Sequence, residues 1–170
     1  MATYEDALDI VTLHASEIIA RSDTDQIVSD LYIVMSEKCE SGSLLNNLNG
    51  IERIFYLCCN FDEAMKNGGI GEFYRQDSGN FANETVEALL EIGAKNSALI
   101  LDKGNGVFKE GVVPEDKLAR IEELDSLDIN DISWLFDELD REFSLHQDNL
   151  NELNLRYVLA NKEAFMLSLI

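Results

Sequence analysis

Carboxylates are the reactive side chains that this sequence gathers most densely in one place. Five of the ten positions between residues 122 and 131 are acidic, namely Glu122, Glu123, Asp125, Asp128 and Asp131. Ten helical residues rise about 15 Å, so these charges would follow one another roughly every 3 Å along the axis. One DNA strand carries a phosphate charge about every 3.4 Å of its axis. A rigid array of this density therefore resembles a phosphate backbone in charge per length, and it would bind a cationic surface.

A second acidic cluster follows the single tryptophan, which lies among Asp131, Asp137 and Glu138. The carboxylates of this cluster are Asp137, Glu138, Asp140 and Glu142. At 100° per residue, Trp134 lies opposite the apolar stripe that runs from residue 132 to residue 143. A tryptophan on an acidic face either packs against another helix of the same bundle or anchors a contact with a second molecule, because Trp is enriched at interface hot spots. Trp134 is therefore a candidate interface anchor, with internal packing as the alternative.

No pattern of catalytic or metal-ligating residues stands out. We expect His14 in an apolar core and His146 at a solvated helix end. The start of a calcium loop at residues 128–131 is not continued, because Ser133 stands where glycine is required and Leu139 where the bidentate glutamate belongs. The sequence therefore predicts no enzymatic activity, no metal ion and no other cofactor.

The whole chain is strongly acidic and still apolar enough to fold. Its 170 residues include 33 acidic and 13 basic side chains, a formal charge of −20, and 46% of them are hydrophobic. Disordered acidic chains lack the apolar residues needed for a core, so a folded body is expected. The charge is densest over residues 110–152, with 14 acidic and 3 basic side chains. Such a surface repels nucleic acid and anionic membranes and attracts basic proteins.

The sequence carries no sign of export or membrane insertion. No run approaches the ~20 apolar residues of a membrane-spanning helix. Residues 1–6 do not begin a basic segment followed by an apolar one, as a secretory signal would. Cys39, Cys58 and Cys59 are odd in number, which fits reduced thiols better than disulfides. We therefore expect a cytoplasmic protein that does not contact membranes.

The elements that hold the carboxylates are predicted to be helices. The chain has one proline, and apolar residues recur at helical spacing almost throughout. We expect a helix over residues 4–19, a second after the capping residue Asp23, and a third from about residue 51 that Asn67-Gly68-Gly69 ends. Two shorter helices follow, the first ended by Gly93.

Beyond a break at residues 104–114, the acidic stretch is predicted to be helical as well. Leu118, Ile121 and Leu124 are spaced by three and are expected to face inward. Asp128 or Asn130 is expected to cap the helix that carries Trp134. The sequence as a whole predicts a compact single all-α domain over residues 1–170, a bundle of about eight or nine helices.

One stretch resembles a known bacterial family. The run Asn67-Gly68-Gly69-Ile70-Gly71-Glu72-Phe73-Tyr74, then Ser78-Gly79, then Glu87-Ala88-Leu89-Leu90-Glu91-Ile92-Gly93-Ala94, is similar to the helical domain of the 19-kilodalton DNA-mimic class. The resemblance covers residues 66–108. It implies an all-α homodimer that occupies the DNA-binding surface of a helix-turn-helix transcription regulator and so excludes operator DNA. The matched residues are structural, so the assignment of a mimicking surface to residues 110–152 rests on their charge.

Two functional hypotheses follow, besides a third, an enzyme or a cation-binding protein, that no motif supports. In the first, a DNA mimic binds a basic helix-turn-helix regulator through Trp134 and the carboxylates Glu122, Glu123, Asp125, Asp128, Asp131, Asp137, Glu138 and Asp140. In the second, an acidic helical scaffold or interaction protein uses Trp134 hydrophobically, and its charge serves only solubility. Replacing Asp125, Asp128 and Asp131 by Asn separates the hypotheses, because only the mimic would lose most of its affinity.

Overall fold

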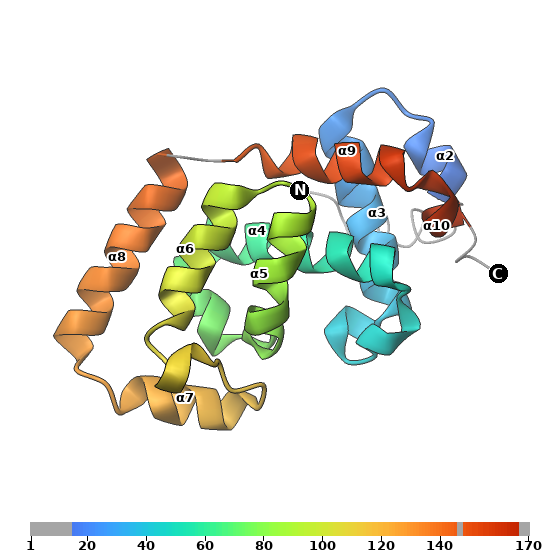
Figure 1. The fold of residues 1–170 in the computed structure, drawn as a ribbon. Helices are drawn as coiled ribbons and strands as arrows, with labels where there is room; N and C mark the ends of the chain where they lie inside the picture. The colour runs from blue at the N-terminus through green and yellow to red at the C-terminus, as the bar shows by residue number, and fades with distance from the viewer. Residues whose placement is uncertain (1–14, 146–147, 167–170) are drawn as a thin grey trace. The chain divides into compact units, whose positions relative to one another are not determined.

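The computed structural model describes residues 15–145 and 148–166, and no strand occurs among them (Figure 1). The described α-helices are α2 (Ala15–Ile19), α3 (Thr24–Lys38), α4 (Gly50–Arg75), α5 (Ala82–Glu91), α6 (Lys95–Asn105), α7 (Lys117–Asp125), α8 (Ile129–Leu145), α9 (Leu150–Ala160) and α10 (Lys162–Met166). Four 3₁₀ turns lie between them, at η1 (Glu40–Gly42), η2 (Leu45–Asn47), η3 (Asp77–Phe81) and η4 (Lys109–Gly111). The all-α prediction is confirmed, and the nine α-helices of the described residues match the predicted number.

Several helix ends lie where the sequence places them. The side chain of Asp23 accepts a hydrogen bond from the backbone N–H of Gln26 and caps α3. Asp128 accepts one from the N–H of Asn130 at the start of α8. Gly93, with φ of 86°, follows the end of α5. His14, His146 and most of the predicted helix 4–19 lie outside the described residues.

The chain divides into two compact units, and the prediction of a single domain stays a prediction. The first unit comprises residues 1–56 and 151–170. In its described part, α2 packs on α3 and α10. Phe55 meets Phe165 edge to face at 5.5 Å, and the ammonium of Lys38 pairs with the fully buried carboxylate of Glu52 at 2.8 Å. These contacts close a core around the start of α4.

The second unit, residues 57–150, contains both acidic helices. Helices α5 and α6 run side by side, and α8 packs on α6 (Figure 1). Aromatic rings fill its centre: Phe61 meets both Phe73 and Phe143 edge to face, and Tyr74 meets Phe108. The buried hydroxyl of Tyr74 donates to Oδ1 of Asn105 at 2.7 Å. The acidic helices therefore lie on a well-packed aromatic core.

One detail of the helix prediction is confirmed and another is wrong. The third helix breaks at Gly69, within the predicted stop Asn67-Gly68-Gly69, and a further helical segment of α4 continues from there to Arg75. On α7, Leu124 is buried, but Leu118 is 77% exposed and Arg120 takes the inward position. The spacing of apolar residues cannot predict a buried Arg at that position. The side chain of Arg120 is stabilised there by five hydrogen bonds instead of apolar packing.

Candidate functional site

Helix α7 is held in place by Arg120, whose side chain is fully buried. Its guanidinium donates to the backbone carbonyls of Tyr74 (2.6 Å), Gln76 (2.8 Å), Pro114 (2.8 Å) and Glu115 (3.2 Å). It also donates to Oδ1 of Asn80 at 2.9 Å. Burial lowers the pKa of Arg120, whereas the charges of Asp77 and Asp116 raise it. The fork geometry of guanidinium lets one residue tie α7 to the end of α4 and to η3.

Helix α8 is held by its apolar stripe. Leu139 and Phe143 are buried, and Ile132, Leu135 and Phe136 are half-buried. This confirms the predicted inner face of the helix. Its start is capped by Asp128, and its middle contacts the break in α4.

The contact with that break involves glycine and a carboxylate. Gly69 adopts φ of 75° and ψ of −173°, a conformation essentially restricted to glycine. A Cβ atom at Gly69 would lie 2.2 Å from Oδ2 of Asp140, and one at Gly71 would lie 3.3 Å from Cδ2 of Phe136. Oδ1 of Asp140 accepts the backbone N–H of Ile70 at 2.8 Å. The glycine run is thus a point at which α8 contacts α4.

The structure separates the eight predicted carboxylates by their surroundings. Within the described residues, no hydrogen bond or ion pair occupies the exposed side chains of Glu122, Asp131 and Asp137. Asp128 is exposed and caps α8. These four leave charge facing solvent on both acidic helices.

The other four predicted carboxylates have partners inside the chain. Asp125 pairs with Arg75 at 2.7 Å, and Glu138 pairs with Arg141 at 3.0 Å. Glu123 accepts the backbone N–H of Lys109 at 2.6 Å. Asp140 is half-buried, and burial raises its pKa, opposed by the hydrogen bond from Ile70 and reinforced by the charge of Asp137.

Several acidic residues of the 110–152 stretch serve helix starts. The carboxylate of Asp116 accepts the N–H of Ala119 and caps α7. Asp148 accepts the N–H of Ser97 at 2.8 Å in the first turn of α6. Carboxylates are favourable there because helix N-termini carry partial positive charge and free N–H groups. Part of the acidic excess therefore serves to stabilise helix starts. Sequence spacing does not reveal this role for Asp148, because it lies far along the chain from the helix start that it contacts.

Trp134 lies on the outward face of α8, as predicted, and 68% of it is exposed. Ile129 and Leu145, at the two ends of the helix, are 68% and 70% exposed. A Trp packed against other helices of its unit would be less exposed, so internal packing does not explain the position of Trp134. An exposed Trp between Asp131 and Asp137 combines an apolar anchor with negative charge.

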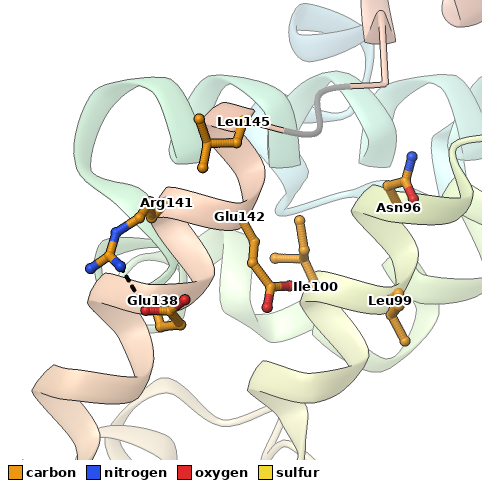
Figure 2. A pocket seen from close by; sticks show the side chains of 7 residues that line it. All are labelled: Asn96, Leu99, Ile100, Glu138, Arg141, Glu142 and Leu145. Carbon is orange, nitrogen blue, oxygen red and sulfur yellow. Dashed lines mark ion pairs between the residues drawn. The ribbon is translucent and has the colours of Figure 1, made fainter.

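A groove of about 440 Å³ lies between α6 and α8 (Figure 2). The exposed side chains of Leu99 and Leu145 border it. Glu142, which lines the groove, pairs with Lys103 of α6 at 2.8 Å, and Glu138 pairs with Arg141 as Figure 2 shows. The charges in the groove are thus balanced, unlike those around Trp134.

The cysteine side chains are buried. The thiols of Cys39, Cys58 and Cys59 are free and buried, and burial raises the pKa of each. Among residues 15–145 and 148–166, no cluster of three His, Cys, Asp or Glu side chains could hold a metal ion. Nor is any helix in these ranges both long and apolar enough to cross a membrane.

The family model of the DMP19-like protein matches residues 46–161. This chain belongs to the DMP19-like protein family. The match confirms the predicted resemblance to the 19-kilodalton DNA-mimic class, and it covers both the glycine-rich stretch and the acidic helices. No curated protein and no solved structure matches the chain. Membership in the DMP19-like family and the exposed carboxylates of α7 and α8 are the two findings that bear on function.

Proposed function

We propose that this protein is a DNA mimic that binds the DNA-binding surface of a helix-turn-helix transcription regulator and blocks its binding to operator DNA. The observation that carries the proposal is the set of exposed carboxylates on α7, on α8 and in the turn between them for which the chain supplies no cation. These are Glu122, Asp128, Asp131 and Asp137. Membership in the DMP19-like family supports the same conclusion.

Rigidity is the second support. A mimic must present charge at fixed positions, because ordering flexible side chains on binding costs free energy. Helix α7 is fixed by the buried Arg120, and α8 by Leu139, Phe143 and Asp140. Asp131 and Asp137 are six residues apart, which is about 9 Å along the helix axis.

Trp134 supplies the apolar part of the proposed interface. On the helical wheel, Asp131 and Asp137 lie about 60° to either side of it. Trp is enriched at interface hot spots, where a large aromatic side chain anchors the contact. The charged rim steers a basic partner toward this face, and the Trp ring slows its dissociation.

We also propose the further properties that the sequence predicts. The protein is a cytoplasmic homodimer that has no catalytic activity, uses no cofactor and contacts neither nucleic acid nor membranes directly. Sedimentation equilibrium of the purified protein tests the dimer, and a monomer throughout the micromolar range would contradict that part.

The test of mimicry is displacement of operator DNA. A panel of purified helix-turn-helix regulators is bound to fluorescently labelled operator duplexes, and the anisotropy is followed while this protein is added. We expect release of the duplex from at least one regulator, and weaker release as salt is raised, because ions screen exposed charges. Release that is insensitive to salt, or formation of a ternary complex with DNA, would contradict mimicry.

A matched pair of variants assigns the effect to the acidic helices. Asp131→Asn combined with Asp137→Asn should weaken binding to the regulator by about tenfold or more, because close interfacial charge pairs contribute upward of about 1.5 kcal/mol. Glu87→Gln combined with Glu91→Gln removes the same charge from the exposed face of α5 and serves as the control. Equal losses from both pairs would show only a general effect of net charge.

The exposure of Trp134 supports the alternative, an acidic helical scaffold that binds hydrophobically. Under that alternative Trp134→Ala abolishes binding to the partner, whereas the Asp131 and Asp137 substitutions leave it intact. Under mimicry both sets of substitutions weaken binding. The same titration therefore separates the two functions.

A further inference from the structure

The break in α4 and the middle of α8 meet through one carboxylate. Gly69 interrupts α4, so the backbone N–H of Ile70 begins a new helical segment without a partner in the preceding turn. Oδ1 of Asp140 accepts that N–H at 2.8 Å, from 70 residues further along the chain. Asp140 therefore acts as a cap for a helix segment to which it does not belong.

The surrounding contacts leave little freedom at this point. Oδ2 of Asp140 lies where a Cβ atom of residue 69 would be, and the ring of Phe136 lies against Gly71. Phe136 and Asp140 are one turn apart on α8, so two successive turns touch the same glycine run. A shift of α8 by one residue would separate both contacts at once.

Asp140 lies away from the centre of the proposed interface. On the helical wheel it is about 180° from Asp131 and about 120° from Trp134, whereas Asp137 is about 60° from Trp134. A partner centred on Trp134 and Asp131 would not reach Asp140. Its half-buried position agrees with this.

We propose that Asp140 is a positioning residue, which fixes the register of α8 on the glycine run 69–71, and is not one of the carboxylates that replace phosphate. This proposal differs from the sequence-based hypothesis, which counted Asp140 among the mimicking charges. The consequence for binding rests on the proposed function, but the positioning role does not. The glycine run that carries the family resemblance then has a structural role, because it positions the helix that carries Asp131, Trp134 and Asp137.

Two variants of Asp140 distinguish the roles. Asp140→Asn keeps a carbonyl oxygen that can accept the N–H of Ile70 and removes only the charge. Asp140→Ala removes the acceptor. Asp137→Asn removes a neighbouring charge that faces solvent and is the control. A positioning role requires that the Asn variant rescue what the Ala variant loses.

The first readout needs no partner. Native-state hydrogen exchange measures the protection of the Ile70 amide, and acrylamide quenching of Trp134, the only tryptophan in the chain, reports the order of α8. In Asp140→Ala we expect the Ile70 amide to exchange about tenfold faster or more, because its hydrogen bond is lost, and quenching to increase. Asp140→Asn and Asp137→Asn should match the wild type in both. An unchanged Ile70 amide in Asp140→Ala would overturn the proposal.

The second readout uses the regulator that the operator-displacement test identifies. Asp137→Asn should weaken binding and lower its dependence on salt, whereas Asp140→Asn should bind like the wild type. If Asp140→Asn weakens binding as much as Asp137→Asn, Asp140 is a contacting charge and the proposal is wrong. If the wild type displaces no operator DNA, the proposed function fails, while hydrogen exchange still decides the role of Asp140.

Discussion

Replacing Arg120 by Met tests the anchor of α7 most directly. The two side chains are similar in length, but Met donates no hydrogen bond, so five acceptors lose their donor. The accepting carbonyls of Gln76 and Glu115 belong to exposed residues and can turn to water, whereas Tyr74 is fully buried.

The magnitude follows from this inventory. A hydrogen bond from a charged group contributes about 1.5–3 kcal/mol, and a buried acceptor without a partner costs about 1–3 kcal/mol. Burial of the charged guanidinium is unfavourable, which is why it lowers the pKa of Arg120. Removing the charge relieves this desolvation cost and offsets part of the stability lost with the hydrogen bonds. We expect Arg120→Met to lower the free energy of unfolding by about 3–5 kcal/mol, as when one partner of a buried charged contact is removed. That is a large fraction of the roughly 5–15 kcal/mol that stabilises a typical domain.

The assay is urea unfolding followed by the fluorescence of Trp134, which reports the unit that contains α7. The control is Arg141→Met, the same chemical change at a side chain that is 62% exposed and paired only at the surface with Glu138. A surface pair contributes at most about 1 kcal/mol, so the control should unfold close to the wild type. If Arg120→Met also stayed within about 1 kcal/mol of the wild type, the reasoning that α7 depends on this residue would be refuted.

Three further predictions concern buried groups and the break in α4. Gly69→Ala should cost about 2–4 kcal/mol of stability, because it strains the backbone and displaces Asp140. Gly50→Ala is the control and should cost less than about 1 kcal/mol, because a Cβ atom at Gly50 meets nothing within 4 Å. Thermal unfolding compares the two variants. Because burial raises the pKa of the Cys58 and Cys59 thiols, neither should react with a disulfide reagent at pH 8 until urea unfolds the protein, and rapid labelling of the native protein would argue against this packing. Because burial raises the pKa of Asp140, the folded state binds its proton more tightly than the unfolded state. The wild type should therefore gain stability relative to Asp140→Asn as the pH falls from 7 toward the ordinary carboxyl range, and a constant difference in urea midpoints would count against the shift.

Local patterns predicted the helices well because their causes are local. The apolar stripe of α8, the cap at Asp23 and the end of α5 at Gly93 each depend on residues within a few positions of one another. The outward position of Trp134 followed from the same periodicity. These features could be predicted because a helix repeats every 3.6 residues whatever lies around it.

The prediction failed where distant residues changed the outcome. Leu118 has inward spacing, but Arg120 finds five acceptors and takes the buried position instead. Three of these acceptors, at Tyr74, Gln76 and Asn80, lie 40 to 46 residues away, so no local window contains them. The break at Gly69 could be predicted from composition, but the carboxylate of Asp140 that caps the next segment lies 70 residues away and could not.

The sequence by itself determined an acidic, all-α chain whose charge favours basic partners, and its match to a family model placed it in the DMP19-like family. Composition and periodicity suffice for the charge and the helical class, because net charge and helix propensity are sums over residues. Only the tertiary structure decided which carboxylates remain available. It engages Glu123, Asp125 and Asp140 within the fold and leaves Glu122, Asp131 and Asp137 facing solvent, since the availability of a charge depends on whether folding brings a cation or a free N–H within reach.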